Sequence, residues 1–141
     1  MIKQGDEVYC EIKKDYKGLV LLVLMNIFAE KGVIIKLKKT RKDSDKIAVT
    51  DTSDFISEKI LFNLMGEKIS IKKIMPVEDK IIRPLYLFLD KEVLLYARLK
   101  SLKYESTEKK KDKISGFIDN LEKKHPEVKH SVVNYFLELQ R

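Results

Sequence analysis

Apolar residues occur in short alternating or continuous stretches in the first third of the chain. Residues 7–13 alternate after a Gly-Asp turn and predict a first strand. The apolar block at 19–28 continues to a stop at Gly32 and predicts a helix buried on more than one side. Apolar stretches at 33–37 and 46–49 predict two more strands, separated by a charged turn.

Helical spacing dominates the rest of the chain. Thr52, Ser53 and Asp54 are favourable caps for a second helix, which we expect to end near Gly66. Residues 68–74 alternate and predict a strand or an extended arm.

Three further helices are expected after a connector at 76–84 that is bracketed by prolines. Asp90 is expected to cap the first, and a lysine-rich stretch opens the second, which spans about 109–124. Pro126 should lie in the first turn of the third, where Tyr135 is expected to pack in the core. This order predicts one α/β domain: a small parallel sheet in a Rossmann-like core (1–84), followed by a helical C-terminal region (85–141).

Composition adds a basic character to this picture. The 141 residues contain 29 Lys and Arg against 22 Asp and Glu, a formal charge of +7. A basic surface favours a polyanionic partner such as nucleic acid, although lysine also serves ordinary solubility. Residues 3–6 near the start are polar and no apolar run approaches the length of a membrane span, so we expect a cytoplasmic protein with no membrane partner.

The one cysteine, Cys10, excludes an internal disulfide and a cysteine cluster made by this chain alone. Its place in an apolar alternation predicts a buried strand residue rather than a reactive thiol.

A set of collinear motifs resembles the tRNA 2-thiolation family of ATP pyrophosphatases, also called the PP-loop family. The first is a Gly-Asp strand followed by Lys13-Lys14-Asp15-Tyr16-Lys17-Gly18 and then Leu19-Val20-Leu21-Leu22. Family members have SGGxDS before Leu-Val-Leu-Leu, a glycine-rich turn that holds the pyrophosphate of ATP. Here lysine or aspartate replaces both glycines, which removes the close backbone approach that phosphate needs.

Two later landmarks extend the resemblance. Where the family has ATGHNxDDxxE before a helix, the chain has Ala48-Val49-Thr50-Asp51-Thr52-Ser53-Asp54-Phe55-Ile56-Ser57-Glu58 and then Asn63-Leu64-Met65. The best-preserved stretch is Arg83-Pro84-Leu85, followed by Val93-Leu94-Leu95-Tyr96-Ala97-Arg98-Leu99-Lys100.

Two departures concern the family's sulfur chemistry. Only a charged turn separates Leu37 from Lys46, where active members insert a segment with a Cys-x-x-Cys-type site. After Tyr104, where members have Cys-Pro-Tyr, the chain continues with Glu105. The resemblance therefore implies an inactive homologue without cofactor, similar to the non-catalytic subunit of the cytoplasmic wobble-uridine thiolation complex.

Two groups of candidate site residues follow. The residues of the degenerate nucleotide site are Lys13, Asp15, Gly18, Asp51, Asp54 and Glu58. The candidate RNA contacts are Lys13, Lys14, Lys17, Arg98, Lys100, Lys109, Lys110, Lys111, Lys113, Lys129 and His130. The spacing of Asp54 and Glu58 also fits a remnant magnesium site, but helix caps and a solvated first turn are the simpler interpretation. We expect no catalytic residue and no metal.

Three functional hypotheses remain open from the sequence. The first is a non-catalytic subunit that pairs with an active tRNA 2-thiolation ATP pyrophosphatase and helps to bind tRNA. The second is a small enzyme that still binds a nucleotide at the carboxyl edge of its sheet, through Thr50, Asp51, Thr52 and Asp54. The third is a structural, self-associating module; a homodimer of the isolated protein is compatible with each hypothesis.

Overall fold

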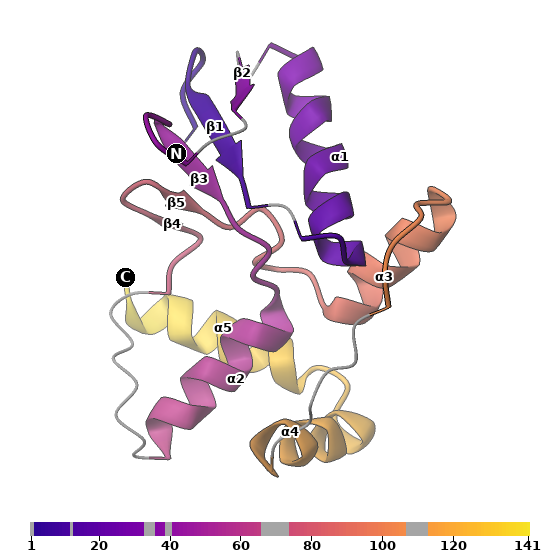
Figure 1. The fold of residues 1–141 in the computed structure, drawn as a ribbon. Helices are drawn as coiled ribbons and strands as arrows, with labels where there is room; N and C mark the ends of the chain where they lie inside the picture. Colours follow the sequence, from indigo (N-terminus) through magenta and orange to yellow (C-terminus); the bar gives the residue numbers. More distant parts are fainter. Residues whose placement is uncertain (1, 12, 33–35, 39–40, 66–73, 107–112) are drawn as a thin grey trace.

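The computed structural model describes all residues except 1, 12, 33–35, 39–40, 66–73 and 107–112. Strands and helices are interspersed up to residue 82, and the elements described after it are all helices (Figure 1). In chain order the elements are β1 (Glu7–Cys10), α1 (Tyr16–Glu30), β2 (Lys36–Lys38), β3 (Lys46–Ala48), α2 (Ser53–Leu64), β4 (Val77–Glu78), β5 (Ile81–Ile82), α3 (Asp90–Leu99), α4 (Lys113–Lys124) and α5 (Val128–Leu139).

The strands form one small, mostly parallel sheet in the order β2-β1-β3-β5-β4. Strand β1 is parallel to both β2 and β3, with Tyr9 opposite Lys38 on one side and Ile47 on the other. Strand β5 continues the parallel sheet beside β3, and only the edge strand β4 is antiparallel. The predicted α/β fold class with a small parallel sheet is therefore confirmed, and the segment interpreted as a connector at 76–84 contains the two short strands β4 and β5.

Helix α1 is buried on two sides, as its continuous apolar sequence predicted. Leu21 and Met25 pack with β-strand residues, including the buried Cys10. Val20 packs on the opposite side with residues of α3 and the segment before it. Figure 1 shows α1 beside the sheet and α3 at the lower end of α1. Helix α1 thus packs against both the sheet and α3.

Helices α2, α4 and α5 form a second layer beyond the sheet (Figure 1). Ile56 and Ile60 of α2 pack against Val133 and Phe136 of α5, with the buried Tyr86 completing this cluster. Tyr86 also donates a hydrogen bond from its hydroxyl to the carbonyl oxygen of Ile74. The same two helices also carry a buried ion pair, between Asp54 of α2 and Lys129 of α5.

Several helix boundaries differ from the expected ones. Leu89, not Asp90, is the N-cap of α3, because the Glu92 carboxylate accepts a hydrogen bond from the Leu89 amide at 2.7 Å. Pro126 precedes α5 rather than lying in its first turn. Tyr135, expected in the core, is exposed. The predictions for 68–73 and 109–112 lie outside the described residues. Among the described helices, none is long and apolar enough to span a membrane.

Candidate functional site

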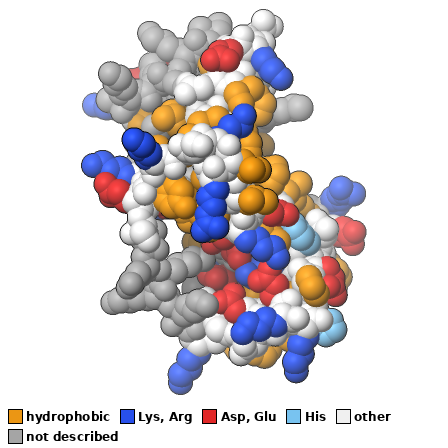
Figure 2. Space-filling view, turned by 90° about the vertical axis from the view of Figure 1, so that its right-hand side faces the viewer, with side chains coloured by type: hydrophobic (Ala, Val, Ile, Leu, Met, Phe, Trp, Pro, Cys, Tyr) orange, Lys and Arg blue, Asp and Glu red, His pale blue; other side chains and the backbone are white. Residues whose placement is uncertain are grey.

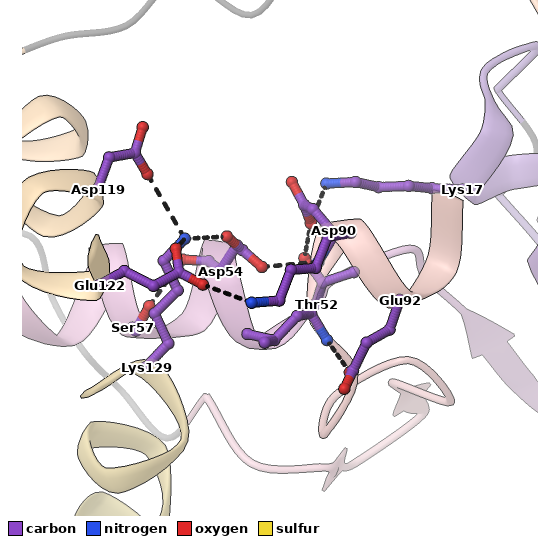
Figure 3. A network of polar contacts seen from close by, with 11 residues as sticks. Lys17, Thr52, Asp54, Ser57, Asp90, Glu92, Asp119, Glu122 and Lys129 are labelled. Carbon is purple, nitrogen blue, oxygen red and sulfur yellow. Dashed lines mark hydrogen bonds and ion pairs between the residues drawn. The ribbon is translucent and has the colours of Figure 1, made fainter. Parts of the chain in front are cut away.

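Helices α1, α2 and α3 begin close together, beyond the carboxyl ends of β1 and β3 (Figure 3). The start of α2 is joined to the segment before α3 by two hydrogen bonds. The Ser53 amide donates to the Phe88 carbonyl and the Ser53 hydroxyl to the Tyr86 carbonyl, both at 2.9 Å. Open α/β sheets bind ligands at this edge, and helix N-termini attract anions. The degenerate nucleotide site predicted from the sequence would lie at this edge of the sheet.

The N-terminus of α1 is occupied by the chain's own groups. Asp15 is the N-cap, and its carboxylate accepts a hydrogen bond from the Gly18 amide at 2.9 Å. The backbone of Lys13 lies directly against Gly18: a Cβ added to Gly18 would be 2.0 Å from the Lys13 carbonyl oxygen. The β1–α1 loop is folded onto the first helical turn, with a carboxylate where a phosphate-binding loop offers free amides.

The N-terminus of α3 is satisfied in the same way, by a carboxylate from the first turn of α2. Asp54, in the first turn of α2, accepts a hydrogen bond from the Asp90 amide at 2.7 Å. The Asp90 carboxylate in turn accepts a hydrogen bond from the Thr52 hydroxyl and forms a 2.8 Å ion pair with Lys17. The Lys17 side chain is only 15% exposed. Carboxylates of the protein itself thus take the positions that favour an anion.

Lys129 of α5 is the centre of the ion-pair network (Figure 3). Its ammonium contacts Asp54, lies 2.7 Å from Glu122 and 3.5 Å from Asp119, and its side chain is 4% exposed. Burial alone would lower the pKa of Lys129, but hydrogen bonds to Asp54 and Glu122 outweigh burial and raise that pKa above its usual range. Lys129 is therefore a buried structural cation, which corrects its expected place among the RNA contacts.

The network extends to α4 through Glu122, which also pairs with Lys91 at 3.2 Å. Burial opposes ionisation of Glu122, but its hydrogen bonds to Lys129 and Lys91 prevail and lower the pKa of this carboxyl. Sequence reasoning missed Asp119 and Glu122. Lys129 is 75 residues from Asp54 in sequence, and no local pattern indicates such a contact.

Asp51, expected in the degenerate nucleotide site, belongs to a separate cluster around Arg83. The Arg83 guanidinium pairs with Asp51 at 2.9 Å, donates to the Met75 carbonyl at 2.7 Å and lies 3.4 Å from Glu78. These contacts attach the β4–β5 hairpin to the segment that follows β3. Glu58 is half-buried one turn along α2 from Asp54.

Lys17 and Lys129 are largely buried and ion-paired, and the other described candidate RNA contacts are dispersed over the surface. Lys13 and Lys14 are exposed at the β1–α1 loop, where Lys14 makes a loose 3.9 Å contact with Glu105. Exposed Lys103, which the sequence reasoning overlooked, lines the same shallow groove as Lys14. The remaining described candidates are exposed Arg98, Lys100 and Lys113 and half-buried His130; Lys109, Lys110 and Lys111 lie outside the described residues.

The chain is similar to known proteins in its fold. No family model and no curated protein sequence matches the chain. Among solved structures, the U34-tRNA thiolase NcsA from Methanococcus maripaludis, determined with its [4Fe-4S] cluster, has a similar fold. The TM-score is 0.73 at 19% sequence identity, covering 98% of this chain and 72% of the thiolase chain. The chain has the fold of a tRNA thiolase domain.

The residues of this chain do not fit an iron–sulfur cluster. Such clusters are held by several cysteine thiolates, and the sequence contains only Cys10. Cys10 is buried in β1, and this burial raises the pKa of its thiol to about 11. Within the described ranges, no group of three or more His, Cys, Asp or Glu side chains is arranged to hold a metal ion.

Proposed function

We propose that this protein is a non-catalytic partner of an active tRNA 2-thiolation ATP pyrophosphatase and that it helps to bind tRNA. The fold similarity to a U34-tRNA thiolase supports a role connected with tRNA thiolation. The motifs at Arg83-Pro84-Leu85 and 93–100 support the same role from sequence. Adenylation and sulfur transfer would then occur on the partner.

The non-catalytic part of the proposal rests on the β1–α1 loop, which is packed onto the first turn of α1 and is called the collapsed loop below. A pyrophosphate needs free backbone amides at this loop, but Asp15 caps α1 and the Lys13 backbone lies on Gly18. Lys17 and Thr52 are likewise engaged by Asp90. ATP would have to displace these internal contacts before it could bind.

The exposed cations at the same loop support the RNA part of the proposal. Lys13, Lys14 and Lys103 lie around the β1–α1 loop and the segment after α3. Lysines contact phosphates without recognising the base sequence. These residues would therefore enlarge the surface that binds tRNA, while the partner binds the nucleotide that is modified.

We expect ATP with Mg²⁺ to leave the thermal unfolding of the protein unchanged. A ligand present at 100 times its Kd would stabilise the folded state by about 2.7 kcal/mol, which differential scanning fluorimetry detects. The matched control is an active ATP pyrophosphatase of the same fold, which should be stabilised. Stabilisation of this protein by ATP would contradict the closed loop and favour a nucleotide-binding enzyme.

Loss of the protein from its native cell is expected to lower 2-thiouridine at position 34 of tRNA. The measurement is mass spectrometry of nucleosides from purified tRNA. Restoring the native protein should restore thiolation, whereas the double variant Lys13→Glu/Lys14→Glu should restore less because it repels phosphates. Lys124→Glu at the exposed end of α4 is the control. Unchanged thiolation without the protein would refute the proposed function.

A further inference from the structure

The Asp54 carboxylate connects two helices that are far apart in the chain. One of its oxygens contacts the Lys129 ammonium of α5, and the other accepts the hydrogen bond from the Asp90 amide at the start of α3. The Asp54 side chain is only 10% exposed. Because each oxygen has its own donor on a different helix, the orientation of this carboxylate depends on both donors. A change at Lys129 should therefore alter the contact between Asp54 and α3.

The contacts of Asp90 continue from α3 to α1. The Asp90 carboxylate pairs with Lys17 at 2.8 Å and also accepts the hydrogen bond from the Thr52 hydroxyl. Lys17 lies in the first turn of α1, directly before Gly18, against which the Lys13 backbone is packed. The Lys17 side chain is largely buried, so water and salt screen this ion pair less than an exposed one. The first turn of α1 is thus attached to the start of α3.

Lys129, Asp54, Asp90 and Lys17 together form a continuous polar connection, which is called the charge relay below (Figure 3). The relay begins on α5, in the helical layer, and ends at the collapsed loop between β1 and α1. The helices that it joins therefore come from both layers of the molecule (Figure 1).

An outer branch of the same network is exposed to solvent. Lys91 of α3 pairs with Glu122, which also pairs with Lys129, but the Lys91 side chain is 63% exposed. Figure 2 shows acidic and basic side chains intermingled on one face of the molecule, below a group of hydrophobic side chains. Exposed ion pairs contribute little to stability because water screens them. Lys91 therefore provides a matched control for Lys129.

We propose that the charge relay is a conformational latch that couples the position of α5 to the closure of the collapsed loop. With Lys129 in place, Asp54 holds the start of α3, Asp90 holds Lys17, and the first turn of α1 stays closed. When α5 withdraws from α2, Asp54 faces the neighbouring carboxylates without its cation and releases the Asp90 amide. The first turn of α1 then opens more often, and the Gly18 amide becomes accessible to water.

The latch is independent of the proposed role in tRNA thiolation, because it concerns contacts within this chain. A coupling of this kind is reciprocal, so opening of the collapsed loop should equally weaken the attachment of α5 to α2.

Native-state hydrogen exchange of the full chain, followed for single amides by NMR, tests the latch. The reporters are the Gly18 amide, bonded to the Asp15 carboxylate at 2.9 Å, and the Leu19 amide, bonded to the Asp15 carbonyl at 3.2 Å. Lys129→Met should make both exchange about tenfold faster or more, under conditions in which the amides of the sheet still exchange slowly. Lys91→Met should leave both rates unchanged.

A double-variant cycle separates this coupling from a general loss of stability. Lys17→Met alone should speed exchange of the Gly18 amide, and Lys129→Met added to it should give little further increase, because the relay is already interrupted. Arg83→Met removes a cation from a separate buried ion-pair cluster. It should leave the exchange of Gly18 at its native rate even where it lowers global stability.

Three results would overturn the latch. The first is unchanged exchange of Gly18 in folded Lys129→Met, and the second is an increase in the double variant that equals the product of the two single increases. The third is an equal increase in Arg83→Met, which would show a general loss of stability. Circular dichroism melts establish that each variant is folded. If Lys129→Met does not fold, Asp90→Asn decides, because it keeps the side-chain shape, removes the charge that holds Lys17 and should also speed exchange of Gly18.

Discussion

Replacing Lys129 by methionine should lower the free energy of unfolding by about 3–5 kcal/mol, the usual cost of removing one partner from a buried ion pair. The methionine retains an apolar stem but leaves the carboxylates of Asp54, Glu122 and Asp119 without the ammonium that they surround. Small domains have a total stability of about 5–15 kcal/mol, so the change would be a large fraction of it. Urea denaturation followed by circular dichroism measures this loss.

Lys124→Met is the control for this experiment. Lys124 is exposed at the end of α4, and substitutions at such positions usually change stability by no more than about 0.5 kcal/mol. A loss below about 1 kcal/mol for Lys129→Met would mean that water or another cation compensates the three carboxylates, and Lys129 would then not be the residue that joins α5 to α2 and α4.

Gly18→Ala should destabilise the protein by about 1–3 kcal/mol, the range for overpacking at a tightly packed position. The added Cβ would lie 2.0 Å from the Lys13 carbonyl oxygen and 2.7 Å from the Lys13 nitrogen. Both are backbone atoms, so the β1–α1 loop itself would have to move. Denaturant unfolding measures the effect, and amide hydrogen exchange at the loop would show whether the loop separates from α1.

Gly116→Ala gives a control with the same chemical change in another helix. Nothing lies within 4 Å of a Cβ at Gly116 in α4, so alanine should stabilise by up to about 1 kcal/mol through its higher helix propensity. Opposite signs at the two glycines would establish that the loss at Gly18 comes from the Lys13 contact. Stabilisation at both positions would contradict the collapsed loop.

Local sequence signals predicted the principal helices and strands well but not the short hairpin. The apolar block of α1 and Gly32, with φ of 72° just after that helix, marked the element and its end. Strands β4 and β5 have two residues each, too few to show a periodicity. Only their hydrogen bonds to each other and to β3 define them.

The sequence motifs selected several residues that the structure brings close together, but they did not predict the contacts of these residues. Asp15, Gly18 and Asp54 were selected from their motif positions, and the structure places Asp15 and Gly18 in the α1 cap and Asp54 at the joined starts of α2 and α3. Lys129 was selected as one lysine among many in a basic chain, which gave no sign of its burial. Its partners are remote in sequence and are brought to it only when α2, α4 and α5 pack together.

The sequence by itself determined the α/β class, the basic surface and the absence of glycines and cysteines that ATP and iron–sulfur chemistry require. These properties depend on residue type and local spacing, which a linear pattern retains. The tertiary structure alone decided that the chain's own carboxylates satisfy the N-termini of α1 and α3, and that Lys129 is internal. Those features depend on long-range packing, which brings together residues that no local pattern connects.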